Sequence, residues 1–145
     1  MSKKERKNIL NYLKIEENST QDLELFIKHK LENIDNEEFY TITKQANDQC
    51  IFLSEKGECY IQDVKPIDCL LWPLTFDYEE GVKKLILYVG NCELVKYLKK
   101  IDILEEYIQD TKKILLDNLS SFNESELIAY SKLLHAPELT MIEKV

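Results

Sequence analysis

Residues 75–89, Thr75-Phe-Asp-Tyr-Glu-Glu-Gly-Val-Lys-Lys-Leu-Ile-Leu-Tyr-Val89, form the stretch that decides the fold class. Both halves of this stretch are rich in aromatic and β-branched residues, which favour β-strands. Glu79-Glu-Gly81 separates the two halves and has the charge and the glycine typical of a hairpin turn. The stretch therefore predicts an antiparallel β-hairpin near residues 74–89.

A second hairpin is predicted upstream, near residues 50–62. Cys50-Ile-Phe-Leu53 and Cys59-Tyr-Ile61 have strand-like composition. Ser54-Glu-Lys-Gly57 between them suits a hairpin loop, because glycine adopts a positive φ without strain.

This second hairpin predicts how its two cysteines lie. If Leu53 pairs with Glu58, Cys50 and Cys59 share one face as diagonal neighbours, with Cα atoms about 7–8 Å apart. That separation is long for a disulfide. It suits two thiolates that bind one metal centre.

Helical periodicity marks the N-terminal flank. Ile9, Leu10 and Leu13 form one short apolar face. Asn18-Ser-Thr20 then offers an N-cap for a second helix. The apolar residues of that helix recur at helical spacing as Leu23, Phe26, Ile27, Leu31 and Ile34.

The C-terminal flank is also predicted to be helical. Asn91 is expected to cap a helix that begins at Cys92. Asp102-x-x-Glu105 and Asn123-x-x-Glu126 resemble capping boxes at the starts of two further helices. The predicted fold class is therefore α+β, with small antiparallel β-hairpins that carry a cysteine cluster and with helices at the N- and C-terminal sides.

Length and charge limit the possible functions. The 145 residues suit a single domain over 1–145. Within it we expect a helical part over 1–36, a cysteine-cluster metal-binding core over 37–100 and a helical part over 101–145. The net charge of −8 argues against nucleic acid as a partner. Three scattered glycines could not build a phosphate-binding loop.

The N-terminal sequence predicts a cytoplasmic protein. Met1-Ser-Lys-Lys-Glu-Arg-Lys7 is charged, and no signal peptide or membrane-spanning stretch is recognisable. We therefore expect no membrane association. Disulfides are rare in the cytoplasm, where clustered cysteines are more often metal-binding or catalytic.

Four cysteines are the candidate ligands of a metal or cluster: Cys50, Cys59, Cys69 and Cys92. Pro66 is expected to start a short helical turn, which places Cys69, like Cys92, near a helix N-terminus. The positive end of a helix dipole favours the thiolate form. Four buried structural thiols are the alternative interpretation, because the chain contains no Cys-x-x-Cys pair.

Residues 40–92 resemble the YkgJ-like family of zinc- or iron-chelating cysteine-cluster proteins, whose domain also occurs in flagellin lysine N-methylases. The matching elements are Cys50-Ile-Phe-Leu, Gly57-Glu-Cys59-Tyr-Ile, Lys65-Pro66-x-x-Cys69, Trp72-Pro73 and the later Cys92. The resemblance implies a metal site built from these cysteines.

This chain also departs from the family pattern. The family has a further cysteine cluster upstream, whereas this chain has no cysteine before Cys50. Lys65 stands where the family has arginine, and Glu93 stands where a proline often follows the last cysteine. Four thiols fit one mononuclear ion or one cubane cluster.

Three functions from different classes follow. The favoured one is a cytoplasmic iron–sulfur protein that holds a 4Fe-4S cluster, is redox-active or supports a protein modification such as the lysine methylation that the resemblance implies. The others are a structural zinc protein that binds a protein partner and a metal-free helical interaction module. Whether the protein is an enzyme stays open, and no catalytic residue is named. His29 and His135 are isolated in the helical flanks and are left out of the site.

Overall fold

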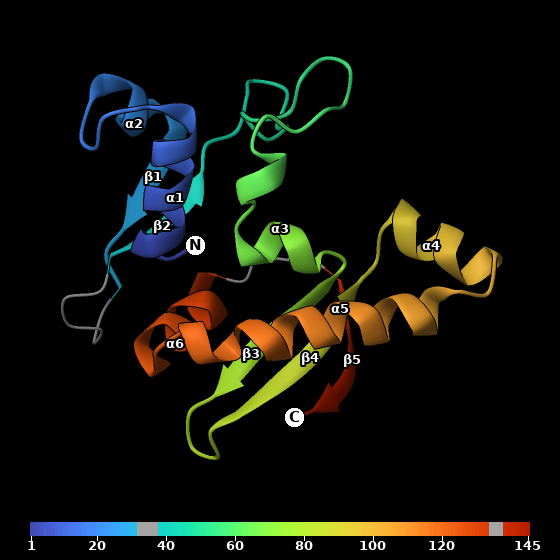
Figure 1. Ribbon diagram of the computed structural model, residues 1–145. Coiled ribbons are helices and arrows are strands. Elements are labelled where there is room, and N and C mark those ends of the chain that lie inside the picture. The colour runs from blue at the N-terminus through green and yellow to red at the C-terminus, as the bar shows by residue number, and fades with distance from the viewer. Residues whose placement is uncertain (32–37, 134–137) are drawn as a thin grey trace. The chain divides into compact units, whose positions relative to one another are not determined.

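The computed structural model describes residues 1–31, 38–133 and 138–145, and the chain divides into two compact units (Figure 1). Unit 1 is Met1–Pro66 and unit 2 is Ile67–Val145. The fold is α+β, with one small antiparallel sheet in each unit. The division falls inside the segment 37–100 that the sequence analysis treats as one core. That the chain acts as a single domain stays a prediction.

Unit 1 pairs short helices with a two-stranded sheet. Its elements are α1 (Lys3–Leu13), α2 (Thr20–Leu25), β1 (Phe26–His29), β2 (Phe39–Ile42) and the 3-10 helix η1 (Gln62–Val64). The strands are antiparallel, with Phe26 opposite Ile42 and His29 opposite Phe39.

Helix α1 forms where the sequence predicts it, and a capping box of two reciprocal hydrogen bonds stabilises its N-terminus. The Ser2 hydroxyl accepts a hydrogen bond from the Glu5 amide, and the Glu5 carboxylate accepts one from the Ser2 amide. Its inner face contributes Ile9 and Leu10 to the core. The core of unit 1 consists of Met1, Ile9, Leu10, Phe26, Tyr40, Phe52 and Ile61.

The second predicted helix is only partly correct. Ser19 caps α2 as expected, because its hydroxyl accepts a hydrogen bond from the Asp22 amide. The helix ends at Leu25, and Phe26–His29 form strand β1 instead. Pairing with β2 overrides the helical spacing of the apolar residues here. Ile34, the last apolar residue of the predicted helix, lies outside the described residues.

The predicted hairpin over residues 50–62 forms a turn but no regular strands. Gly57 has a φ of 80°, and the Ser54 amide donates to the Glu58 carbonyl at 2.8 Å. Leu53 forms an isolated bridge with Cys59, so the predicted pairing of Leu53 with Glu58 is wrong by one residue.

Unit 2 contains a three-stranded antiparallel sheet with helices. Its elements are α3 (Ile67–Leu71), β3 (Leu74–Glu79), β4 (Lys84–Gly90), α4 (Glu93–Lys100), α5 (Leu104–Asn118), the 3-10 helix η2 (Leu119–Ser121), α6 (Glu124–Leu133) and β5 (Leu139–Lys144). The predicted hairpin over 74–89 is confirmed as β3 and β4. Their register pairs Leu74 with Val89 and Glu79 with Lys84.

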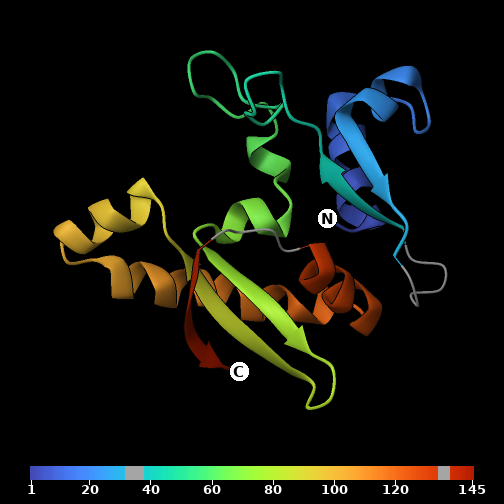
Figure 2. The ribbon, with the colours of Figure 1, turned by 180° about the vertical axis from the view of Figure 1, so that it is seen from behind.

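Alternation along β3 and β4 decides which face of the sheet is buried. Leu74, Phe76, Leu85 and Leu87 point to one face and are each less than 5% exposed. Figures 1 and 2 show α5 and α6 along one face of this sheet. The ring of Tyr130 from α6 lies 5.5 Å from that of Phe76, which joins helix and sheet in one core.

Strand β5 was not expected from the sequence. It pairs with β4, which becomes the central strand of the order β3-β4-β5. A bulge interrupts the register between Leu87 and Tyr88. Beyond the named strand, the Leu85 and Val145 backbones exchange both hydrogen bonds, at 2.9 and 2.8 Å.

The predicted caps of the C-terminal helices are partly confirmed. Asn123 and Glu126 exchange the hydrogen bonds of a capping box at the start of α6. Asn91 does not cap α4, whose N-cap is Cys92. Asp102 does not cap α5, whose N-cap is Ile103. His135 and Pro137 lie outside the described residues.

Candidate functional site

The four cysteines occupy four different environments. Cys50 is exposed in the turn region before residue 53, and Cys59 is half-buried against the core of unit 1. In unit 2, Cys69 is exposed on α3, and Cys92 is a half-buried N-cap with no side-chain capping bond. None of these four cysteines forms a disulfide.

The metal centre predicted from the sequence is not formed. Among the described residues, which include all four cysteines, no group of three or more His, Cys, Asp or Glu side chains is placed to hold a metal ion. The predicted function, an iron–sulfur or zinc protein that uses Cys50, Cys59, Cys69 and Cys92 together, is therefore wrong. The preference for iron–sulfur over zinc stays a prediction.

The bridge that Leu53 forms differs by one residue from the pairing on which the predicted placement of Cys50 and Cys59 depends. The prediction needs Leu53 opposite Glu58, whereas Leu53 pairs with Cys59. A shift of one residue moves every side chain of a strand to the other face. Cys59 packs against the core of unit 1. Cys50 is exposed, and its backbone forms an isolated antiparallel β-bridge with Lys44.

Comparison with protein-family models, with curated proteins and with solved structures gave no match to this chain. The resemblance to the YkgJ-like family thus stays a prediction. Of the helices in the described residues, none has the length and apolar character needed to span a bilayer.

A buried ion pair lies between α1 and α2 in unit 1. Arg6 is 3% exposed and Asp22 is 1% exposed. Arg6 Nε donates to Asp22 Oδ1 at 3.0 Å, and Arg6 Nη2 donates to Asp22 Oδ2, which makes the pair bidentate. The guanidinium also lies 4.4 Å from the centroid of the Tyr40 ring.

Glu38, close to this ion pair, also has a positively charged partner. Glu38 accepts hydrogen bonds from Lys28 and from the Tyr40 hydroxyl, each at 2.7 Å. These bonds, the one from Lys28 first, lower the pKa of Glu38 to about 2. Burial and then the bond to Glu38 raise the pKa of Tyr40 to about 12. Burial lowers the pKa of Arg6, but its bonds and charges, led by the bond to Asp22, raise it overall.

Further hydrogen bonds hold this network together. The Asp22 carboxylate also accepts from the Asn18 amide at 2.7 Å, and Arg6 Nη1 donates to Glu17 at 3.3 Å. Within the described part of the chain, no buried side-chain nitrogen or oxygen lacks a partner. The sequence does indicate that Arg6 is buried, because Arg6 lies on the same inner face of the helix as Ile9 and Leu10.

The Glu38 interactions predict acid sensitivity in unit 1. Because the folded-state pKa is lowered from 4.5 to about 2, its contribution to stability is complete above about pH 4.5. That contribution is lost as the pH falls towards 2. We expect Glu38→Gln to be less stable than the original protein at pH 7, with a difference that disappears between pH 4.5 and 2. Urea unfolding at several pH values, followed by circular dichroism, measures this difference.

The control for this prediction is Glu55→Gln, in the exposed loop of residues 54–57. We expect it to leave the free energy of unfolding nearly unchanged at every pH. A difference for Glu38→Gln that stays constant from pH 7 to pH 2 would contradict the prediction.

Helix α4 presents apolar side chains on two faces. Val95 and Leu98 are buried in unit 2. Leu94, Tyr97 and Ile101 recur at i, i+3 and i+7 on a neighbouring face and are 39%, 58% and 42% exposed. With Ile103, which is 40% exposed just beyond the helix, they form what we call the α4 surface. The apolar arc of α4 is thus wider than the part that unit 2 covers.

The charge of α4 is opposite to that of the chain. The helix contains three lysines and one glutamate, whereas the whole protein has a net charge of −8. Lys96 donates to Glu93 at 2.6 Å, and this bond raises the pKa of Lys96. Lys100 forms no ion pair with any described residue, and it follows Tyr97 by three positions. An unpaired cation therefore flanks the α4 surface.

Proposed function

We propose that the protein is a protein-binding module and that the α4 surface is its docking site. The supporting observation is the second apolar face of α4, on which Leu94, Tyr97 and Ile101 are exposed together. Tyrosine is enriched among the residues that dominate binding energies at interfaces. Aligned exposed apolar residues on a helix commonly bind a partner helix.

The partner that fits this surface is an amphipathic helix with acidic flanks. Its apolar stripe would cover Leu94, Tyr97 and Ile101, and its carboxylates would face Lys100. A second copy of this chain fits less well, because two α4 surfaces would bring like charges together. An anionic membrane fits less well too, because it repels a protein with a net charge of −8.

A displayed library of amphipathic helical peptides with varied flanking residues tests this proposal. We expect the selected peptides to have acidic flanks. The variant Leu94→Ala/Tyr97→Ala should bind them at least about tenfold more weakly, as measured by fluorescence anisotropy. The matched control is Val82→Ala, because Val82 is 56% exposed in the β3–β4 turn.

A charge reversal tests the acidic part separately. Lys100→Glu should weaken binding of the acidic peptides, whereas Lys56→Glu, which changes the net charge equally in a loop of unit 1, should not. Three outcomes would overturn the proposal: equal binding by the double variant, binding only to anionic vesicles, or a self-association that the double variant abolishes.

We also retain as a proposal, about ancestry alone, that residues 40–92 are related to the YkgJ-like family. The order of Cys50-Ile-Phe-Leu, Gly57-Glu-Cys59 and Lys65-Pro66-x-x-Cys69 supports it. A homologue that keeps this order and also has the upstream cysteines would support this ancestry further.

A further inference from the structure

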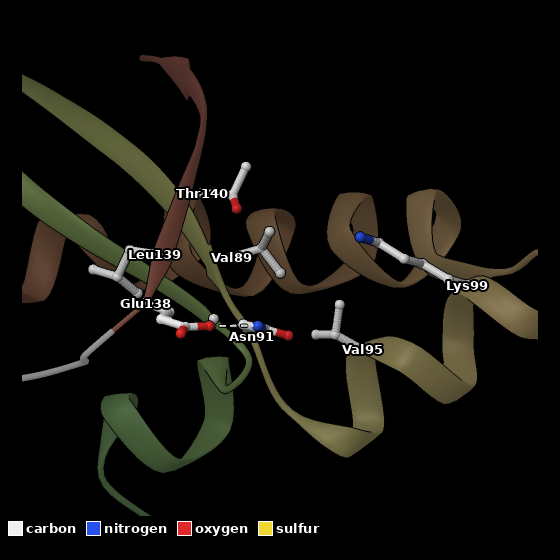
Figure 3. Close-up of a pocket in the computed structure, with 8 residues that line it drawn as sticks. Val89, Asn91, Val95, Lys99, Glu138, Leu139 and Thr140 are labelled. Carbon is white, nitrogen blue, oxygen red and sulfur yellow. Dashed lines mark hydrogen bonds between the residues drawn. The ribbon is translucent and has the colours of Figure 1, made fainter.

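A cavity of about 460 Å³ in unit 2 lies where α4 meets the paired ends of β4 and β5 (Figure 3). Its volume falls in the range of about 300–1,000 Å³ typical of small-molecule sites. Val89, Val95 and Leu139 contribute its apolar lining. Val89 and Val95 are at most 9% exposed, so the sheet and the helix hold this apolar floor in place.

Two polar groups of the cavity have no partner among the residues that the structure describes. Within the described part of the chain, the Lys99 ammonium forms no ion pair or hydrogen bond and the Thr140 hydroxyl forms no hydrogen bond. Figure 3 shows the Lys99 side chain reaching back along α4 towards Val89, with the Thr140 hydroxyl turned to the same space. A cation and a hydroxyl donor thus both face the apolar floor.

A carboxylate stands at the other side of the cavity. Glu138 Oε2 accepts a hydrogen bond from the side-chain nitrogen Nδ2 of Asn91 at 2.5 Å (Figure 3). The backbone amide of Asn91 donates to the backbone carbonyl of Glu138 at 3.2 Å. Glu138 is therefore held by Asn91. Its negative charge repels every anion that enters the cavity, and it repels a phosphate group, which carries up to two charges, more than a single carboxylate.

We propose that this cavity binds a small monocarboxylate with a short hydrocarbon body. The carboxylate accepts hydrogen bonds from Lys99 and Thr140, and the bond from the charged Lys99 is the stronger kind. The hydrocarbon body lies on Val89, Val95 and Leu139, where it leaves water. This site is separate from the α4 surface, because neither Leu94 nor Tyr97 lines the cavity.

Titration of the isotope-labelled protein with hexanoate tests this proposal by NMR. We expect saturable shifts of the amides of Gly90, Val95 and Thr140. Hexylamine, which has the same hydrocarbon body and the opposite charge, should bind at least about tenfold more weakly. The same shifts from hexanoate and hexylamine at equal affinity would overturn the role of Lys99.

Two lysine variants form a matched pair. Lys99→Met removes the charge and keeps an aliphatic side chain, and it should weaken hexanoate binding at least about tenfold. Lys100→Met removes a charge one residue away, outside the cavity lining, and should leave binding unchanged. Thr140→Val, which keeps the shape and removes the hydroxyl, should weaken binding by about threefold.

Other outcomes would overturn the proposal. Hexanoate shifts that lie outside the cavity would do so, as would equal loss of binding in the Lys99→Met and Lys100→Met variants. Inorganic phosphate that binds at Lys99 as tightly as hexanoate would overturn the apolar part of the site. Loss of hexanoate binding in the variant Leu94→Ala/Tyr97→Ala would contradict a site that is separate from the α4 surface.

Discussion

Replacing Arg6 with methionine is expected to lower the free energy of unfolding of unit 1 by about 3–5 kcal/mol. Arg6 provides the counter-charge of Asp22, whose side chain is only 1% exposed. Without the guanidinium, a buried carboxylate keeps its charge with no counter-charge or takes up a proton, and both weaken the native state. Denaturant unfolding, with hydrogen exchange of the α1 amides as a local probe, measures the loss.

Two further variants separate this effect from a general loss of charge. Lys7→Met removes a neighbouring cation that is 58% exposed and only 3.9 Å from Glu17, so its effect should stay within about 0.5 kcal/mol. Arg6→Met/Asp22→Leu removes both charges and should be more stable than Arg6→Met alone. A loss below about 1 kcal/mol for Arg6→Met would show that the pair is not what stabilises unit 1.

Leu87→Ala is expected to destabilise unit 2 by about 2–5 kcal/mol. Leu87 is 0% exposed and lies on β4, the central strand, opposite Phe76. Shortening it removes apolar contacts and leaves a cavity that strands on both sides prevent from closing. Trp72 is the one tryptophan of the chain and lies in unit 2, so its fluorescence follows this unfolding.

The control for Leu87→Ala is Val82→Ala, which shortens an apolar residue that is 56% exposed in the β3–β4 turn. We expect a change within about 0.5 kcal/mol. Similar effects of the two substitutions would mean that the face of the sheet that contains Leu87 is not a tightly packed core.

Local signals predicted much of the fold. Two strand-like runs around Glu79-Glu-Gly81 predicted β3 and β4 because a short hairpin is decided by neighbouring residues. The caps at Ser19 and Asn123 are equally local. Strand β1 was missed because it is stabilised by pairing with β2, whose residues come ten or more positions later in the chain. Locally, the spacing of Leu23, Phe26 and Ile27 matches a helix.

The candidate site was harder to predict than the fold. A four-cysteine centre needs the side-chain direction of every thiol to be correct, and the predicted pairing of Leu53 with Glu58 was already wrong by one residue. The α4 surface was missed for a different reason. Leu94, Val95, Leu98 and Ile101 all suit an inward-facing helix, and only the structure separates the covered residues from the exposed ones.

The late position of β5 in the chain has a consequence for biosynthesis. β3 and β4 leave the ribosome close together, but the third strand of their sheet begins only at Leu139, after α4, α5, η2 and α6. Until then one edge of β4 has unpaired backbone groups on an apolar strand, which is the kind of edge that recruits strands from other chains. Nascent chains of this protein should therefore depend most on chaperones between the emergence of β4 and the emergence of β5 from the ribosome.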